Sequence, residues 1–171
     1  VDIYLQSGTG ATTASAYGAT ITDTRTWMDH VDDLDAVGKR LLDDGEFQVI
    51  AAGGNEETNI AGSSDPGTTG GHVDTAGRRI ISFVGCEDCT GVTYQWLSDQ
   101  SYRYDGTMSF GWYDLPGGKG DIYIQGNNAD VKLRAGGIWD RGANCGSRCR
   151  DAVGSRWITD SYSGARGAAE P

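Results

Sequence analysis

Apolar residues recur at helical spacing between residue 24 and about residue 42. The recurring positions are Trp27, Val31, Leu34, Val37 and Leu41. Intervals of three and four residues place them on one face of a helix. The opposite face carries Asp29, Asp32, Asp33 and Asp35. We expect these carboxylates to form a solvated face rather than a metal site, and His30 to lie at the surface or in packing.

A second, shorter helix is predicted from Asp44 to Ala52, because Gly53-Gly54 follows it and provides a stop. Two similar alternating runs, residues 2–6 and 121–125, predict edge or neighbouring strands of one antiparallel system. The apolar run 79–84 predicts a buried strand.

The aromatic run 91–97 predicts a further element packed on the core. Residues 53–78 and 105–120 are rich in glycine and polar residues, and they predict long irregular loops, which often carry function. The pattern as a whole predicts an α+β fold with two short helices, small antiparallel sheets and long Gly-rich loops.

Composition agrees with one compact unit over residues 1–171, since the chain has 171 residues, 27 Gly, 5 Trp and 3 Pro. A net charge of −10 argues against nucleic acid as a partner. Residues 133–171 differ from the rest, with 6 Arg, no Lys and 4 acidic residues. Their arginines suit fixed hydrogen bonds to carboxylates and carbonyl groups. No apolar run has the ~20 residues of a membrane-spanning helix. Because the chain begins at Val1, we expect it to be the C-terminal part of a longer protein.

Three sequence blocks resemble the formylglycine-generating-enzyme type of C-type lectin fold. The first is Gly38-Lys39-Arg40-Leu41-Leu42, followed by Glu46-Phe47 and Ala51-Ala52-Gly53-Gly54. The second is Gly91-Val92-Thr93-Tyr94-Gln95-Trp96-Leu97-Ser98-Asp99. The third is Leu133-Arg134-Ala135-Gly136-Gly137-Ile138-Trp139 with the closing Gly164-Ala165-Arg166. Their order along the chain is that of the family, so the resemblance implies a C-type lectin fold.

Within this fold, residues 70–79, 85–89 and 144–150 are similar to the variable proteins of diversity-generating retroelements, and most of all to ligand-binding domains from archaeal viruses. In those proteins a reverse transcriptase rewrites adenines in the repeat that encodes the C-terminus. The resemblance implies a ligand-binding domain with a variable segment at about residues 133–171, on a virion or cell surface. The partner would be a protein or another cell-surface ligand, without nucleic acid or membrane insertion.

The resemblance also indicates which positions vary. They are Ile138, Asp140, Arg141, Asp151, Val153, Gly154, Ile158, Asp160, Tyr162 and Ser163. Each of these residue types is reachable from an Asn codon by changing adenines. We expect the apolar members to form a patch with a polar rim of Asp140, Asp151 and Asp160. The remaining interpretation for Ile138 and Val153 is ordinary core strand.

A rigid frame must hold such a patch. We expect Trp139 and Trp157 to anchor the segment in the core. Five arginines are expected to tie its loops to carboxylates and carbonyl groups: Arg134, Arg148, Arg150, Arg156 and Arg166.

The main alternative function is a copper oxidase, because the enzymatic relatives use a cysteine pair near the C-terminus. Here Cys145 and Cys149 have one residue fewer between them than that pair, and Arg150 falls where the second thiolate ligand is required. We therefore expect no catalytic residue, metal or cofactor. An invariant structural tail or adhesin module is a further alternative.

Cys86 and Cys89 leave other possibilities open, since the four cysteines could form a zinc site, a disulfide or buried free thiols. At the family's calcium site, Val92 and Gln95 replace oxygen ligands, which disfavours calcium.

Overall fold

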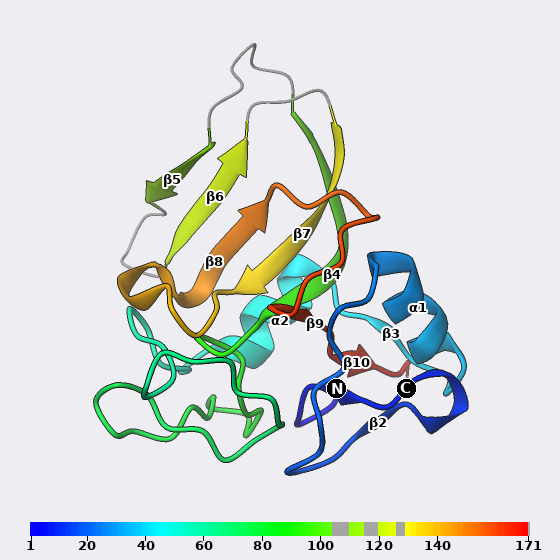
Figure 1. Cartoon of the computed structure of the whole chain (residues 1–171), viewed down its shortest axis with the longest axis horizontal. Coiled ribbons are helices and arrows are strands. Elements are labelled where there is room, and N and C mark those ends of the chain that lie inside the picture. The colour runs from blue at the N-terminus through cyan, green and yellow to red at the C-terminus, as the bar shows by residue number, and fades with distance from the viewer. Residues whose placement is uncertain (104–109, 115–119, 126–128, 171) are drawn as a thin grey trace.

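A computed structural model describes residues 1–103, 110–114, 120–125 and 129–170. It shows an α+β architecture in which a mixed six-stranded sheet dominates (Figure 1). The strands of this sheet are β4 (Tyr94–Arg103), β5 (Phe110–Asp114), β6 (Asp121–Gln125), β7 (Ala129–Gly136), β8 (Gly146–Ala152) and β9 (Ser163–Gly164). Their order is β5-β6-β8-β7-β4-β9. The pairs β6–β8 and β4–β9 are parallel, and the other neighbours are antiparallel.

Two small sheets join distant parts of the chain. β1 (Gln6–Ser7) pairs with β2 (Ala14–Ser15), and β3 (Arg40–Leu41) pairs with β10 (Gly167–Ala168). Two short 3-10 helices, η1 (Gly10–Thr12) and η2 (Gly142–Asn144), complete the elements. The two ends of the described chain lie side by side, and the amide of Asp2 donates to the carbonyl of Gly167 at 2.9 Å (Figure 1).

Helix α1 (Trp27–Asp35) begins where its sequence provides a cap. The Thr26 hydroxyl accepts from the amide of Asp29 at 3.1 Å, and the Asp29 carboxylate accepts from the amide of Thr26 at 2.9 Å. The helix ends well before Leu41, so the expected extent to about residue 42 is wrong. Gly38 has a φ of 70°, which a helix cannot accommodate, and residues 40–41 form β3 instead.

The acidic face of α1 is not uniformly solvated, which corrects the sequence-based expectation. Asp33 is buried and paired with Arg25 at 2.9 Å, and it also accepts from the side chain of Gln6 at 3.1 Å. His30 is completely buried, and its Nδ1 lies 2.8 Å from the Gln6 side-chain oxygen. This polar cluster fixes α1 against the N-terminal strand.

Helix α2 (Asp44–Ala51) confirms the second predicted helix. Asp43 and Glu46 form a capping box, and Arg40 binds the Glu46 carboxylate at 2.7 Å. Phe47 on its buried face packs with Leu97 and Ala135 of the main sheet. In the part of the chain that the structure describes, no helix has the length and apolar character that a membrane crossing requires.

Two predictions about strands fail, and one loop prediction is wrong in part. Residues 79–84 form isolated bridges rather than a strand, and Phe83 is 87% exposed. Residues 2–6 do not neighbour β6, since β1 pairs only with β2 among the described strands. Within residues 105–120, β5 is regular, while 105–109 and 115–119 lie outside the described residues. The irregular character of residues 53–78 and the core element within 91–97 are confirmed.

Gly136 is the last residue of β7 and lies at a close approach to a second backbone segment. Its φ is 93°, and a Cβ there would meet the carbonyl oxygen of Cys89 at 2.3 Å. The same glycine's carbonyl accepts from the amide of Gly91 at 3.0 Å. Only glycine permits this close approach of two backbone segments.

The buried His30 predicts an acid-sensitive fold. Burial lowers the pKa of His30 from 6.5 to about 4. The unfolded chain therefore binds one more proton between these values, so the free energy of unfolding falls as pH decreases through this window. The full loss below pH 4 is on the order of 3 kcal/mol. Urea unfolding of wild type and His30→Gln at several pH values measures it. An unchanged slope in the variant between pH 6.5 and pH 4 would contradict the assignment.

Candidate functional site

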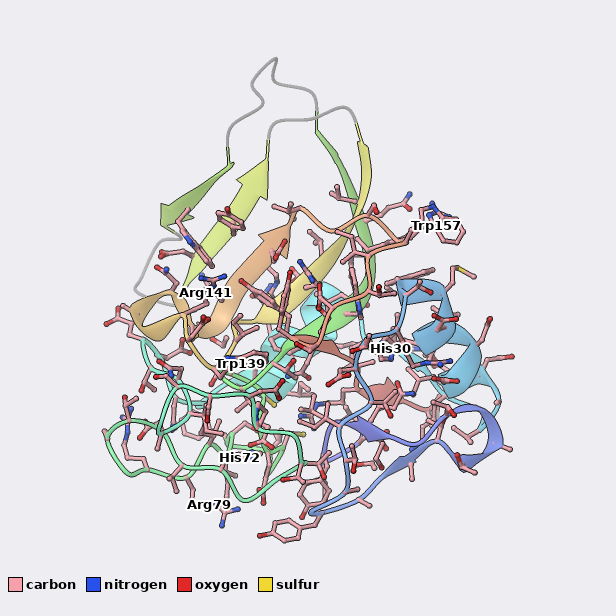
Figure 2. All side chains as sticks on the ribbon, in the orientation of Figure 1. His30, His72, Arg79, Trp139, Arg141 and Trp157 are labelled. Carbon is pink, nitrogen blue, oxygen red and sulfur yellow. The ribbon has the colours of Figure 1, made fainter. Side chains whose placement is uncertain are left out.

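A cavity of about 450 Å³ opens on one face of the main sheet. Nine of its lining residues come from the C-terminal segment: Arg134, Ile138, Trp139, Asp140, Arg141, Asp151, Val153, Ile158 and Tyr162. Three come from outside that segment: Tyr94, Trp112 and Tyr123. Figure 2 shows Trp139 and Arg141 on the same side of the molecule, close to the start of β8. This volume lies within the usual range of small-ligand pockets.

Strand register explains how distant residues meet beneath this cavity. Trp112 of β5 lies opposite Tyr123 of β6, and Tyr123 lies beside Asp151 of β8. Asp151 is in turn opposite Arg134 of β7, which is opposite Trp96 of β4. Residues opposite one another in register share a sheet face. The row therefore crosses five strands on one face.

Arg134 is the hub of this row. Its side chain is 4% exposed and donates to Asp151, Asp160 and Ser163 at distances of 2.7, 2.7 and 2.6 Å. Burial disfavours its charge, but the two carboxylates outweigh this effect and raise the pKa of Arg134. The guanidinium is therefore charged and holds β8 and the segment after it against β7.

Aromatic rings surround the same guanidinium. Its central carbon lies 5.1 Å from the ring centroid of Tyr94, 5.0 Å from that of Trp96 and 5.5 Å from that of Tyr162. Such contacts stabilise a cation that burial has removed from water. Burial also raises the pKa of Tyr94, so its phenol is neutral at physiological pH.

The loop at residues 138–142 is held from a distant part of the chain. The Asn59 amide group donates to the carbonyl of Trp139, and its oxygen accepts from the amide of Gly142 at 3.1 Å. Asn59 is 5% exposed. The side chains of Asp140 and Arg141 are roughly half-exposed and only 3.7 Å apart at their nearest charged atoms. The backbone is thus fixed while these two side chains face solvent.

The segment from Val153 to Tyr162 is fastened in the same way, mainly through its backbone. Lys132 donates from its amide to the carbonyl of Gly154 at 2.9 Å, and Thr24 donates to that of Asp160 at 2.9 Å. The amide of Tyr94 donates to the carbonyl of Tyr162 at 2.9 Å. These bonds do not involve the side chains of Val153, Ile158 and Tyr162, which line the cavity.

Seven of the ten predicted positions line the cavity: Ile138, Asp140, Arg141, Asp151, Val153, Ile158 and Tyr162. Among them Ile138 is only 3% exposed and packs in the core as well as lining the cavity. Gly154, Asp160 and Ser163 are not among the lining residues. Ser163 is fully buried, and a Cβ on Gly154 would come within 3.0 Å of the Trp96 ring. Side-chain replacement is therefore sterically restricted at these two positions.

Two further expectations need correction. Asp151 and Asp160 do not form a polar rim, because both side chains are buried against Arg134. Trp157 does not anchor the segment, since it is 69% exposed and lies at the far margin of the sheet near α1 (Figure 2). Trp139 does pack against the core, as expected.

The expected arginine ties are confirmed at three of the five positions, Arg134, Arg150 and Arg166. Besides Arg134, Arg150 is buried and binds Asp44 of α2. Arg166 is fully buried and donates to the carbonyl of Asp2 at 2.9 Å and to the Gln95 side chain at 3.0 Å. Arg148 is exposed.

Sequence reasoning missed the aromatic wall that Trp112 and Tyr123 provide. Their ring centroids are 4.9 Å apart, with an interplanar angle of 35°. Tyr123 lies in the run 121–125, which predicts a strand, whereas Trp112 lies in a stretch predicted to be an irregular loop. Pairing of β6 with the distant β8 is not encoded locally. The aromatic run 91–97 predicts Tyr94 only as part of a core element, and no sequence motif assigns a role to Asn59.

The four cysteines are buried free thiols. Burial raises the pKa of Cys145 to about 12 and also raises that of Cys149. Cys145 lies with its sulfur 3.3 Å from the carbonyl oxygen of Ile138. Among the described residues, no group of three or more His, Cys, Asp or Glu side chains is placed to hold a metal ion.

Val92 and Gln95, the two residues expected to disfavour calcium, make contacts elsewhere. Val92 is fully buried with Ile60 and Ile80. Gln95 donates to the carbonyls of Asp88 and Cys89 and accepts from Arg166.

The elements and their arrangement define the C-type lectin fold, as the sequence blocks predict. Solved structures of the Major Tropism Determinant share this fold. The U1 and M1 variants each superpose with a TM-score of 0.72 and 24% sequence identity, over 97% of this chain and 48% of theirs. The P3c variant gives a TM-score of 0.70 and 22% identity over the same shares. The chain thus spans about half the length of these proteins. No protein-family profile and no curated protein sequence matches the chain.

The Arg134 hub predicts a large difference between two arginines that line the same cavity. Arg134→Met leaves Asp151 and Asp160 as buried carboxylates without their cation, which costs about 3–5 kcal/mol of unfolding free energy. Arg141→Met, at an exposed position, changes it by about 0.5 kcal/mol or less. Urea denaturation of both variants measures the two effects. Equal, small losses would show that Arg134 does not hold the site together.

Proposed function

We propose that this chain is a ligand-binding domain whose C-terminal segment is diversified by a retroelement. The observation that carries the proposal is the cavity described above. Five positions expected to vary line it without holding the frame, namely 140, 141, 153, 158 and 162, while its backbone is held by buried bonds from elsewhere. Such an arrangement permits side chains to change without loss of the fold.

The structural neighbours support binding as the function. Their name assigns those proteins a role in determining tropism. By analogy, this chain would bind a protein or another ligand on a cell surface, from a position on a virion or cell surface. The resemblance of residues 70–79, 85–89 and 144–150 to archaeal-virus variable proteins favours a virion. Sharing a fold alone does not determine function, so the site carries the argument.

We also propose that the chain has no enzymatic activity. The oxidase alternative requires two thiolates at an accessible copper site. Cys145 and Cys149 are instead fully buried, with raised pKa values that keep them protonated. Arg150, which falls in the position of the second ligand, is bound to Asp44. These contacts support a structural role for both cysteines.

Diversification predicts a pattern in natural populations. Substitutions should concentrate at codons 140, 141, 153, 158 and 162, whose side chains line the cavity without holding the frame. Codons 134 and 136 should remain fixed, because replacing Arg134 or Gly136 disrupts buried structure. Deep sequencing of the 3′ end of the gene across one population measures this. A uniform sequence at the five codons would remove the proposal's basis and favour an invariant structural module.

The binding proposal also predicts no stable copper complex. Purified protein mixed with one equivalent of Cu(I) and then desalted should retain no metal, because the protonated thiols are poor ligands. Elemental analysis measures the bound copper. Stoichiometric copper that is lost in Cys145→Ser and Cys149→Ser would instead support the oxidase.

A further inference from the structure

Part of the cavity wall lies outside the segment proposed to vary. Tyr94, Trp112 and Tyr123 precede residue 133, and all three rings line the cavity. Trp139 adds a fourth ring, packed edge-on against Tyr162 with centroids 6.4 Å apart. Its codon contains no adenine, so adenine rewriting leaves it unchanged. Every variant of the domain would therefore share these four rings.

The charges at the cavity sum to a negative value. Three carboxylates, Asp140, Asp151 and Asp160, line it or pair with its lining, against the two guanidinium groups of Arg134 and Arg141. Oδ1 of Asp160 is buried and has no hydrogen-bond partner among the described residues. The protein as a whole has a net charge of −10, which attracts cations over a longer range.

The Arg134 guanidinium is not available to bind an incoming anion. Its terminal nitrogens already donate to Asp151, Asp160 and Ser163. Its remaining nitrogen, Nε, has no hydrogen-bond partner among the described residues, but it is buried against Gly154, where a Cβ would be 3.4 Å away. The guanidinium is therefore neutralised by its carboxylate partners, and its one unpaired donor is buried rather than exposed to an incoming anion.

We propose that this cavity receives a cationic side chain, arginine or lysine, from a protein ligand. The inference rests on the proposed function and specifies what the site binds. Electron-rich faces of Trp and Tyr attract a cation that enters a partly desolvated site. The shared rings would attract the cation in every variant. The variable side chains at the mouth would select which ligand residues can lie next to the bound arginine or lysine.

The mouth of the cavity carries two opposite charges that make the proposal testable. Asp140 would attract the incoming cation and Arg141 would repel it. Both side chains are nearly half-exposed, and among the described residues their one ion pair is the 3.7 Å contact with each other, so neutral replacements leave the frame intact. Asp140→Asn should weaken binding of a cation about two- to fivefold, and Arg141→Gln should strengthen it by a similar factor.

The experiment is an NMR titration of the full chain with N-acetyl-arginine amide and with its neutral isostere, N-acetyl-citrulline amide. The indole N–H resonances are assigned with Trp112→Phe, Trp139→Phe and Trp157→Phe. We expect saturable shifts for Trp112 and Trp139, no shift for the distant Trp157, and roughly tenfold tighter binding of the arginine probe.

Equal affinity for the citrulline probe, no saturable shift, stronger binding in Asp140→Asn or weaker binding in Arg141→Gln would overturn the inference. These results are independent of population sequencing. If the probe does not bind but the five codons vary, the ligand class is wrong and the proposed function stands. If the probe binds but the codons are uniform, the cation site stands and diversification fails.

Discussion

A single buried cation organises the region that we assign to binding. Arg134 connects β7 to Asp151 of β8 and to Asp160 in the segment that returns to β9, and aromatic rings cover it. A buried charge is tolerated when partners of opposite charge are present, as Asp151 and Asp160 are here. The cavity floor is therefore a fixed electrostatic unit. Substitutions of side chains above this floor change the surface, whereas substitutions within the floor alter the packing of three strands.

Contacts from distant parts of the chain complete the frame. Asn59 fixes residues 139 and 142, and Glu56 accepts from both the amide and the hydroxyl of Ser147. Arg166 joins the closing segment to the N-terminal residues. The long loop at residues 53–78 thus has a structural role in supporting the binding face, although its sequence resembles an ordinary surface loop. In a scaffold of this kind, different residues provide stability and recognition, so recognition can change while stability is preserved.

Local chemistry was readable from the sequence, and long-range pairing was not. The Gly53-Gly54 stop is a short-range signal, and α2 ends at Ala51, just before it. The buried strand predicted at residues 79–84 is not formed, because strand formation depends on distant segments. An apolar run does not reveal whether a sheet is available to pair with it and cover it. Likewise, Trp157 looked like a core residue by type, yet its place at the margin of the sheet leaves it exposed. The aromatic wall depends on a parallel pairing between β6 and β8 that no local pattern specifies.

The central claim is that a fixed frame carries exchangeable side chains. Its most direct test is a surface-displayed library in which each residue from 133 to 166 is saturated, with folded variants selected by resistance to protease. The account predicts broad tolerance at Asp140, Arg141 and Ile158, and almost none at Arg134 and Gly136, whose environments are buried and sterically fixed. Comparable tolerance at all five positions would contradict the division between frame and binding surface.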